Sequence, residues 1–154
     1  MARLRNRAVA VGLAVMVTAL SGCQGSGPSI DDLLDMPAAG LAYPSSIELA
    51  RDQRDAETSV VAKNPAALRV FRCAEASSAV ILTWFNEQLA ADGWAAGRDE
   101  VDVLPGSGYE GPTHSWRKAK HRFVLRFLTA DRAAALAQQQ GKACPGTGYE
   151  TRLS

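Results

Sequence analysis

Histidine and cysteine are scarce in this chain of 154 residues, which has two histidines and three cysteines. The side chains near His114 and His121 are basic, so the sequence offers no set of carboxylate or thiolate ligands to complete a metal site. There is no C-x-x-C pair, which argues against a redox dithiol. The G-x-S-x-G, H-E-x-x-H and phosphate-loop motifs are also absent. No catalytic residue and no metal is therefore predicted, and a non-enzymatic role is favoured.

An excess of charge of one sign is also missing. The chain has 17 lysines and arginines against 16 aspartates and glutamates. Proteins that bind nucleic acid usually carry a clear basic excess, so no nucleic-acid partner is expected.

Long apolar runs are absent except at the start of the chain, where residues 8–20 are apolar and follow Arg3, Arg5 and Arg7. The run is shorter than the about 20 apolar residues that span a bilayer. A basic segment followed by an apolar run of this length is typical of a secretion signal.

The end of the run, Leu20-Ser21-Gly22-Cys23, resembles the lipobox of bacterial lipoproteins. The resemblance implies that residues 1–22 are removed and that the Cys23 thiol carries a diacylglycerol, with acyl chains such as palmitate. Two acyl chains suffice for stable anchoring, whereas one binds only marginally. We therefore expect a cell-membrane lipoprotein, anchored on the extracytoplasmic face, whose partner is the membrane and which needs no other cofactor.

The expected mature chain has 132 residues, because 22 of the 154 are removed. Without the three arginines of the signal, 14 basic residues remain against 16 acidic ones. Cys73 and Cys144 remain after lipidation, and an oxidising compartment favours a disulfide between them; two free buried thiols are the alternative. We expect a lipidated Cys and flexible tether over 23–42 and one globular domain over 43–154.

Alternation and capping signals predict the elements of that domain. Strands are expected at 47–50, 68–73, 100–104 and 149–153, a hairpin at 113–117 and 122–128, and helices at 77–92 and 129–140, with a short turn or helix at 30–36. This order predicts an α+β fold: a small antiparallel or mixed sheet with two helices packed on one face, as a two-layer sandwich.

Three aromatic residues, Trp84, Phe85 and Trp94, are grouped around the first long helix and its end. Trp84 and Phe85 form an apolar stripe at helical spacing with Ile81 and Leu89, which predicts core packing. Trp94 follows Gly93 at the helix end, where we expect it to pack back on Leu89. The alternative interpretation is a ligand-stacking platform.

Four cationic residues of the expected hairpin, Arg117, Lys118, Lys120 and Arg122, form the most suggestive charged patch. Such a patch is able to contact anionic headgroups. The alternative is a solvated hairpin tip.

Several short motifs resemble small actinobacterial lipoproteins. They are Tyr-Pro-Ser at 43–45, Arg-Val-Phe at 69–71, Trp-Phe and Gly-Trp at 84–85 and 93–94, and Trp-Arg-Lys at 116–118. The resemblance covers roughly residues 43–153 and implies a location in the cell envelope, without a specific activity.

These observations leave three hypotheses for the function. The first is a membrane-anchored envelope lipoprotein that acts as a non-enzymatic binding or interaction module, with an envelope protein or a lipid as its partner. The second is a membrane-proximal enzyme whose site is dispersed in the sequence. The third is a lipid-surface adaptor that uses the basic hairpin at 117–122.

Overall fold

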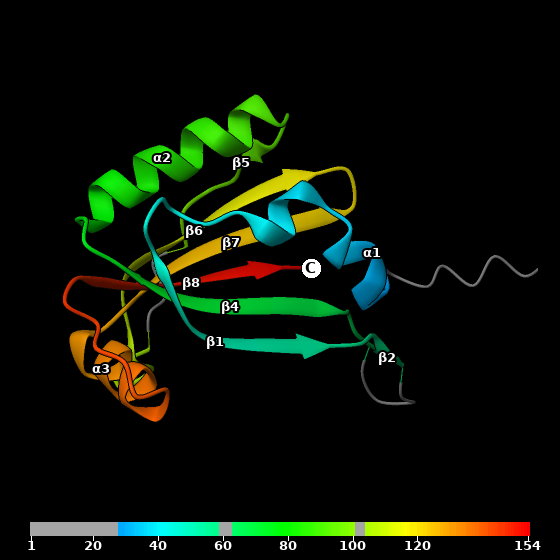
Figure 1. The fold of residues 1–154 in the computed structure, drawn as a ribbon. Coiled ribbons are helices and arrows are strands. Elements are labelled where there is room, and N and C mark those ends of the chain that lie inside the picture. The colour runs from blue at the N-terminus through cyan, green and yellow to red at the C-terminus, as the bar shows by residue number, and fades with distance from the viewer. Residues whose placement is uncertain (1–27, 59–62, 101–103) are drawn as a thin grey trace, which may run out of the picture.

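The computed structural model describes residues 28–58, 63–100 and 104–154, which are built around a six-stranded antiparallel sheet (Figure 1). Across the sheet the strands are β1 (Ile47–Arg54), β4 (Ala67–Ala74), β8 (Thr147–Leu153), β7 (His121–Leu128), β6 (Tyr109–Lys118) and β5 (Ala95–Ala96). β2 (Glu57–Thr58) and β3 (Lys63–Asn64) form a separate pair. The helices are α1 (Ile30–Leu34), the 3-10 helix η1 (Pro37–Gly40), α2 (Ser78–Ala91) and α3 (Ala130–Gln139). The α+β class is confirmed.

Helix α2 begins and ends as its sequence predicts. The hydroxyl of Ser77 accepts a hydrogen bond from the amide of Val80, which satisfies one of the free amides at the helix start. At the other end Gly93 has a φ of +78° and Trp94 donates its amide to the carbonyl of Leu89 at 2.9 Å. This pattern is a Schellman motif, which turns the Trp94 side chain back onto the helix.

The sheet face beneath α2, called the α2 face below, is the main core. Phe123, Leu125 and Phe127 alternate along β7 and are buried there. The ring of Phe85 from α2 lies 5.8 Å from the rings of both Phe123 and Tyr149, between centroids. Core packing is thus confirmed for Phe85 and Trp94, whereas Trp84 is half-buried at the rim of the core.

Residues 30–41 belong to the folded domain, so the expected tether over 23–42 is too long. A capping box between Ser29 and Asp32 starts α1, and Leu33 is 0 % exposed against the α2 face. Burial of Leu33 and of two alanines of η1, Ala38 and Ala39, gives this short segment its fixed position.

Helix α3 lies on the opposite face of the sheet, below it in Figure 1, and not beside α2 as expected. Ala133 and Ala137 pack against Leu49, Phe71 and Leu128. Close approach is possible because Gly148 stands beneath the helix: a Cβ there would lie 2.5 Å from that of Ala133.

Two further strand predictions are only partly met. The strand expected to begin over 47–50 continues as β1 to Arg54, into a polar stretch whose structure the sequence left open. Of the expected strand at 100–104, Glu100 forms an isolated bridge with Thr113, and residues 101–103 lie outside the described ranges. The described edge strand beside β6 is the short β5 instead.

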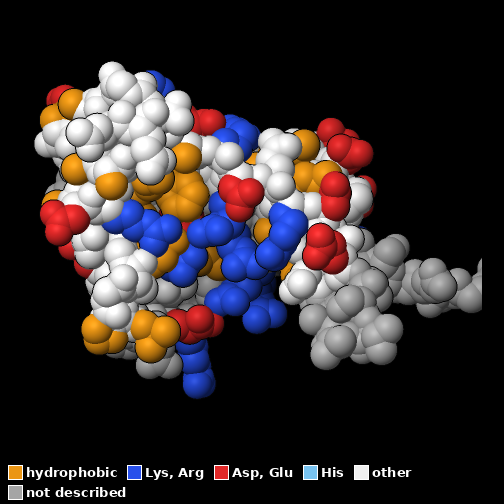
Figure 2. Space-filling model, turned by 90° about the horizontal axis from the view of Figure 1, so that it is seen from below, with side chains coloured by type: hydrophobic (Ala, Val, Ile, Leu, Met, Phe, Trp, Pro, Cys, Tyr) orange, Lys and Arg blue, Asp and Glu red, His pale blue; other side chains and the backbone are white. Residues whose placement is uncertain are grey.

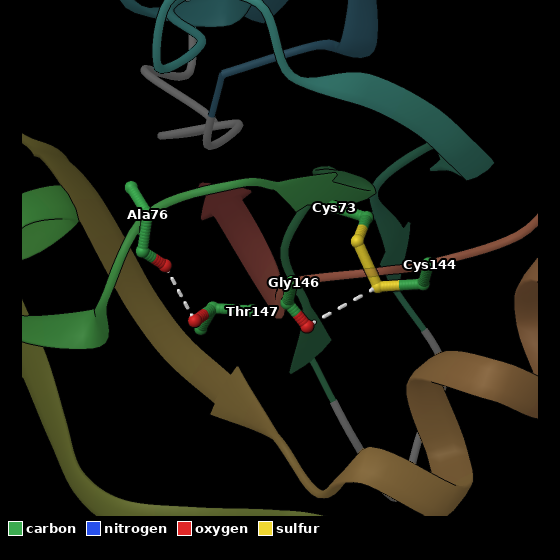
Figure 3. Close-up of a disulfide and its surroundings, with 5 residues drawn as sticks. All are labelled: Cys73, Ala76, Cys144, Gly146 and Thr147. Carbon is green, nitrogen blue, oxygen red and sulfur yellow. Dashed lines mark hydrogen bonds between the residues drawn. A yellow bond between two sulfur atoms is a disulfide. The ribbon is translucent and has the colours of Figure 1, made fainter.

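The predicted disulfide is confirmed, because Cys73 and Cys144 are bonded with their Cα atoms 5.6 Å apart. Figure 3 shows that it ties the segment after α3 to the end of β4. Next to it, the hydroxyl of Thr147 donates to the carbonyl of Ala76 at 2.6 Å. The disulfide therefore helps to hold α3 and the start of β8 against the sheet.

Candidate functional site

The basic hairpin residues do not act as one patch, because the strands point them to opposite faces. Lys118 shares its face with Trp116 and reaches the α2 side, where its Nζ lies 3.0 Å from Oδ1 of Asp92. Arg117 and Arg122 are directly opposite each other on the other face. Lys120 is at the exposed turn between the strands. The predicted patch is therefore divided.

The face opposite the α2 face is lined by arginines and is called the arginine face below. Arg54, Arg69, Arg117, Arg122, Arg126 and Arg152 come from five strands, and Arg132 comes from α3. Because α3 covers only one end of this face, the other end is left to the arginines. Figure 2 looks at this side and shows lysine and arginine side chains gathered in its middle.

Strand register explains why residues far apart in the chain meet there. Side chains on one face of a sheet alternate along each strand and adjoin their direct partners across it. Arg69 on β4 is directly opposite Arg152 on β8, and Glu150 on β8 is directly opposite Arg126 on β7. The central strand β8 thus places one carboxylate and one guanidinium in the middle of the arginines.

Glu150 is the charged centre of the arginine face, and it is 1 % exposed. Its carboxylate lies 3.1 Å from Nε of Arg69 and 3.0 Å from Nη2 of Arg126, and it accepts a hydrogen bond from the hydroxyl of Tyr109. Burial would raise the pKa of Glu150, but the hydrogen bond from Tyr109 and the charges of Arg126 and Arg69 outweigh it and hold that pKa below its ordinary value. Glu150 is therefore a fixed negative charge.

Aromatic rings order the neighbouring guanidiniums. The guanidinium carbons of Arg126 and Arg132 lie 4.0 Å and 4.4 Å from the centroid of the Tyr109 ring. The Phe71 ring lies beneath Arg69 at 5.4 Å. Contacts of this kind favour one orientation of each guanidinium plane.

Arg152 is a half-buried arginine that has no ion pair in the described ranges. Its Nε is buried without a hydrogen-bond partner among the described residues. Burial, followed by the charges of Arg69 and Arg54, lowers its pKa from the ordinary arginine value. The Nε atoms of Arg122 and Arg126 are likewise buried and unpaired within the described structure. The arginine face therefore holds positive charge that an anion is suited to neutralise.

The two histidines do not converge on one site. His114 is buried and its Nδ1 lies 2.9 Å from Oδ1 of Asp99, whereas His121 is at the start of β7, opposite Lys118. Across the described residues, no group of three or more His, Cys, Asp or Glu side chains is arranged to hold a metal ion.

Sequence reasoning identified Arg117 and Arg122 but missed the centre of the arginine face at Arg69, Glu150 and Arg152. The available signal was the alternation of arginine with apolar residues in each strand, which places Arg122 and Arg126 on one face. What it does not reveal is which strands are neighbours.

Cys23 and the signal at 1–22 lie outside the described residues, as do residues 24–27 of the tether. Among the helices that the structure describes, none has the length and apolarity needed to cross a bilayer. Comparisons with family models, curated proteins and solved structures find no match to the chain.

Proposed function

We propose that this chain is a lipid-anchored protein of the bacterial cell envelope that binds an anionic partner through its arginine face. The lipobox at 20–23 supports the anchor, and the Cys73–Cys144 disulfide is in keeping with an oxidising compartment outside the cytoplasm. The convergence of arginines around Glu150 carries the proposal for binding.

Binding is favoured over catalysis because of the state of Glu150. A general base needs an oxygen that can take a proton from a substrate. The carboxylate of Glu150 is buried, is held ionised, and already accepts hydrogen bonds from Arg69, Arg126 and Tyr109. Its role is to position the arginines.

The adaptor that uses the hairpin at 117–122 is the second candidate, and one observation favours it. Asp32 in α1 lies close enough to Lys120 and His121 for their charges to help lower its pKa, after the larger effect of the hydrogen bonds from Ser29. The hairpin turn therefore lies at the end of the domain where the tether enters. In a lipid-anchored protein this turn would face the headgroups, with Lys120 as the nearest exposed cation.

The anchor is tested by mass spectrometry of the chain produced in a bacterium. We expect a mature protein that begins at Cys23 and carries a diacylglycerol, and a Cys23→Ala variant that has lost both the lipid and the cleavage. Ser21→Ala keeps a small residue in the lipobox and serves as the control that is still processed. An unmodified Cys23 in the wild-type protein would refute the anchor.

The anionic partner is tested by retention of the detergent-solubilised protein on heparin, a sulfated polyanion. The variant Arg122→Gln/Arg152→Gln should elute at clearly lower salt than the wild type. Lys118→Gln/Arg51→Gln removes the same charge from the α2 side of the sheet, because Lys118 pairs with Asp92 and Arg51 is directly opposite Val70, a residue of the α2-face core. Equal loss in both double variants would mean that net charge, and not the arginine face, binds the polyanion.

A further inference from the structure

We infer that the open end of the arginine face binds a small, soluble, phosphate-bearing molecule with at least two negative charges, centred on Arg152. This inference rests on the proposed function and names its ligand class. Arg152 has Arg69 as its direct neighbour on β4. On β7 its direct partner is Val124, so Arg122 and Arg126 are its two diagonal neighbours. Direct neighbours have Cβ atoms about 5 Å apart and diagonal ones about 7–8 Å apart, within the reach of arginine side chains.

The four guanidiniums keep unused hydrogen-bonding capacity. Each guanidinium has five N–H donors, and in the described part of the chain the side-chain hydrogen bonds of Arg122 and Arg126 use Nη2 alone. Because Nε of Arg122, Arg126 and Arg152 is buried, the terminal Nη atoms are the donors left for a ligand. The ion pairs of Arg122 and Arg69 with Glu100 and Asp52 are exposed, so an anion is able to compete for both cations. An anion beside Arg152 would also offset the positive charges of Arg69, Arg54 and Arg126, which lower the pKa of Arg152 after the larger effect of burial.

The site is ordered before any ligand arrives. Glu150 holds Arg69 and Arg126 from beneath, and Tyr109 stacks on Arg126. The side chains of Arg69, Arg126 and Arg122 are 32 %, 27 % and 35 % exposed, so they are partly covered and still accessible to a ligand. Preorganised side chains lose little conformational entropy on binding, which favours affinity for a small ligand.

The number of guanidiniums selects phosphate over a single carboxylate. A carboxylate presents two oxygens in one plane and is matched by one arginine fork. Four guanidiniums that approach from β4, β8 and β7 require more acceptor oxygens in more directions, and more than one negative charge. A phosphate monoester or a diphosphate meets both requirements.

The position of the site favours a soluble ligand over a bilayer surface. The tether enters through α1, which packs on the α2 face, whereas the arginines are on the opposite face. A flat bilayer would first meet the exposed hairpin turn at Lys120, which leaves the partly exposed arginine side chains to a molecule in solution.

The test is calorimetric titration of the full processed protein, in neutral detergent and chloride buffer, with pyrophosphate. We expect saturable binding that weakens at least about tenfold in Arg152→Gln, because charge-assisted hydrogen bonds are lost. Arg122→Gln should weaken binding in the same direction. Lys118→Gln, on the other face, should bind within about twofold of the wild type. Thermal unfolding midpoints near that of the wild type establish that the variants are folded.

Three results would overturn the inference. The first is no pyrophosphate binding, or equal binding by wild type and Arg152→Gln. The second is equal affinity for citrate, which carries similar charge on carboxylates and would remove the selection for phosphate. The third is Arg152-dependent binding to vesicles containing phosphatidylglycerol without binding of pyrophosphate, which would make the headgroup the source of the phosphate. These results concern the ligand class alone. If retention on heparin still depends on Arg152, the proposed binding of an anionic partner holds even when the phosphate-bearing ligand is excluded.

Discussion

The two faces of the central sheet are made from alternate residues of the same strands, yet one face is an apolar core and the other carries charged side chains. On the α2 face, Phe123 and Tyr149 contact Phe85 in a core closed by α1 and α2. On the arginine face, the intervening residues of β7 and β8 include Arg126, Glu150 and Arg152, and α3 covers only one end. Burial of apolar side chains on the α2 face stabilises the fold. The arginine face is therefore able to retain charged residues that do not themselves stabilise the fold.

Phe85→Ala should give the largest loss, because it removes a fully buried ring from the α2 face. We expect about 3–5 kcal/mol less free energy of unfolding, measured by urea denaturation of a soluble form that begins at Pro28 and keeps every described element. Val80→Ala, in the same helix at 50 % exposure, should change stability by less than about 0.5 kcal/mol. Equal midpoints for Phe85→Ala and wild type would place the ring outside the core and break the comparison.

The disulfide gives the next largest effect, and it belongs to the arginine-face side of the sheet. Cys73 and Cys144 are separated by 71 residues, and their joint replacement by serine should cost about 2–4 kcal/mol, chiefly by freeing the unfolded chain. Hydrogen exchange should increase more in α3 than in α2, because the bond anchors the segment after α3. A reductant should lower the wild-type midpoint and leave that of the double variant unchanged.

Elements with complete local signals are those that the sequence predicts well. Helix α2 has a capping serine, an apolar stripe and Gly93, and the β6–β7 hairpin has clear alternation. The face chosen by α3 was not predictable, because its buried residues are alanines, whose apolar signal is weak. The incorporation of α1 depends on Leu33 finding a place in a core that only the complete fold creates.

The candidate site lacks a local signal because it depends on strand order. Arg69 and Glu150 lie 81 residues apart and meet only because β8, the last strand, inserts between β4 and β7. The direction of single side chains follows from alternation, which places Arg122 and Arg126 on the same face of β7. The pairing of β4 with β8, which brings Arg69 to Arg152, is a non-local choice that alternation does not encode.

Glu150→Gln should cost about 2–3 kcal/mol. Removing one partner of a fully buried ion pair typically costs about 3–5 kcal/mol, and the loss is smaller here because solvent reaches Arg69 and Arg126. If the variant is as stable as the wild type at neutral pH, Glu150 does not hold the arginine face together.

The same substitution should change the acid dependence of stability. The folded-state pKa of Glu150 lies below the ordinary value of 4.5, so its contribution is present above about pH 4.5 and is lost as the pH falls through the folded-state pKa. The difference in unfolding free energy between wild type and Glu150→Gln should therefore shrink on acidification below pH 4.5. Urea titrations at pH 7, 5 and 3.5 measure it, and a difference that grows towards low pH would contradict the assignment.

Arg152→Gln should give the smallest effect on stability, and of the opposite sign. Arg152 lies among Arg69, Arg54 and Arg126, and its Nε is buried without a partner in the described ranges. Replacing it by a neutral side chain of similar length removes repulsion, and we expect stability to stay equal or rise by up to about 1 kcal/mol. The matched control is Arg51→Gln, because Arg51 is paired with Glu48 at 2.8 Å and its loss should destabilise by up to about 0.5 kcal/mol.

A rise in the urea midpoint of Arg152→Gln, together with weaker anion binding, would show that this arginine is maintained for a ligand at the expense of the fold. A clear fall in the midpoint would instead show that Arg152 stabilises the fold. The two faces would then differ in chemistry, but both would serve stability.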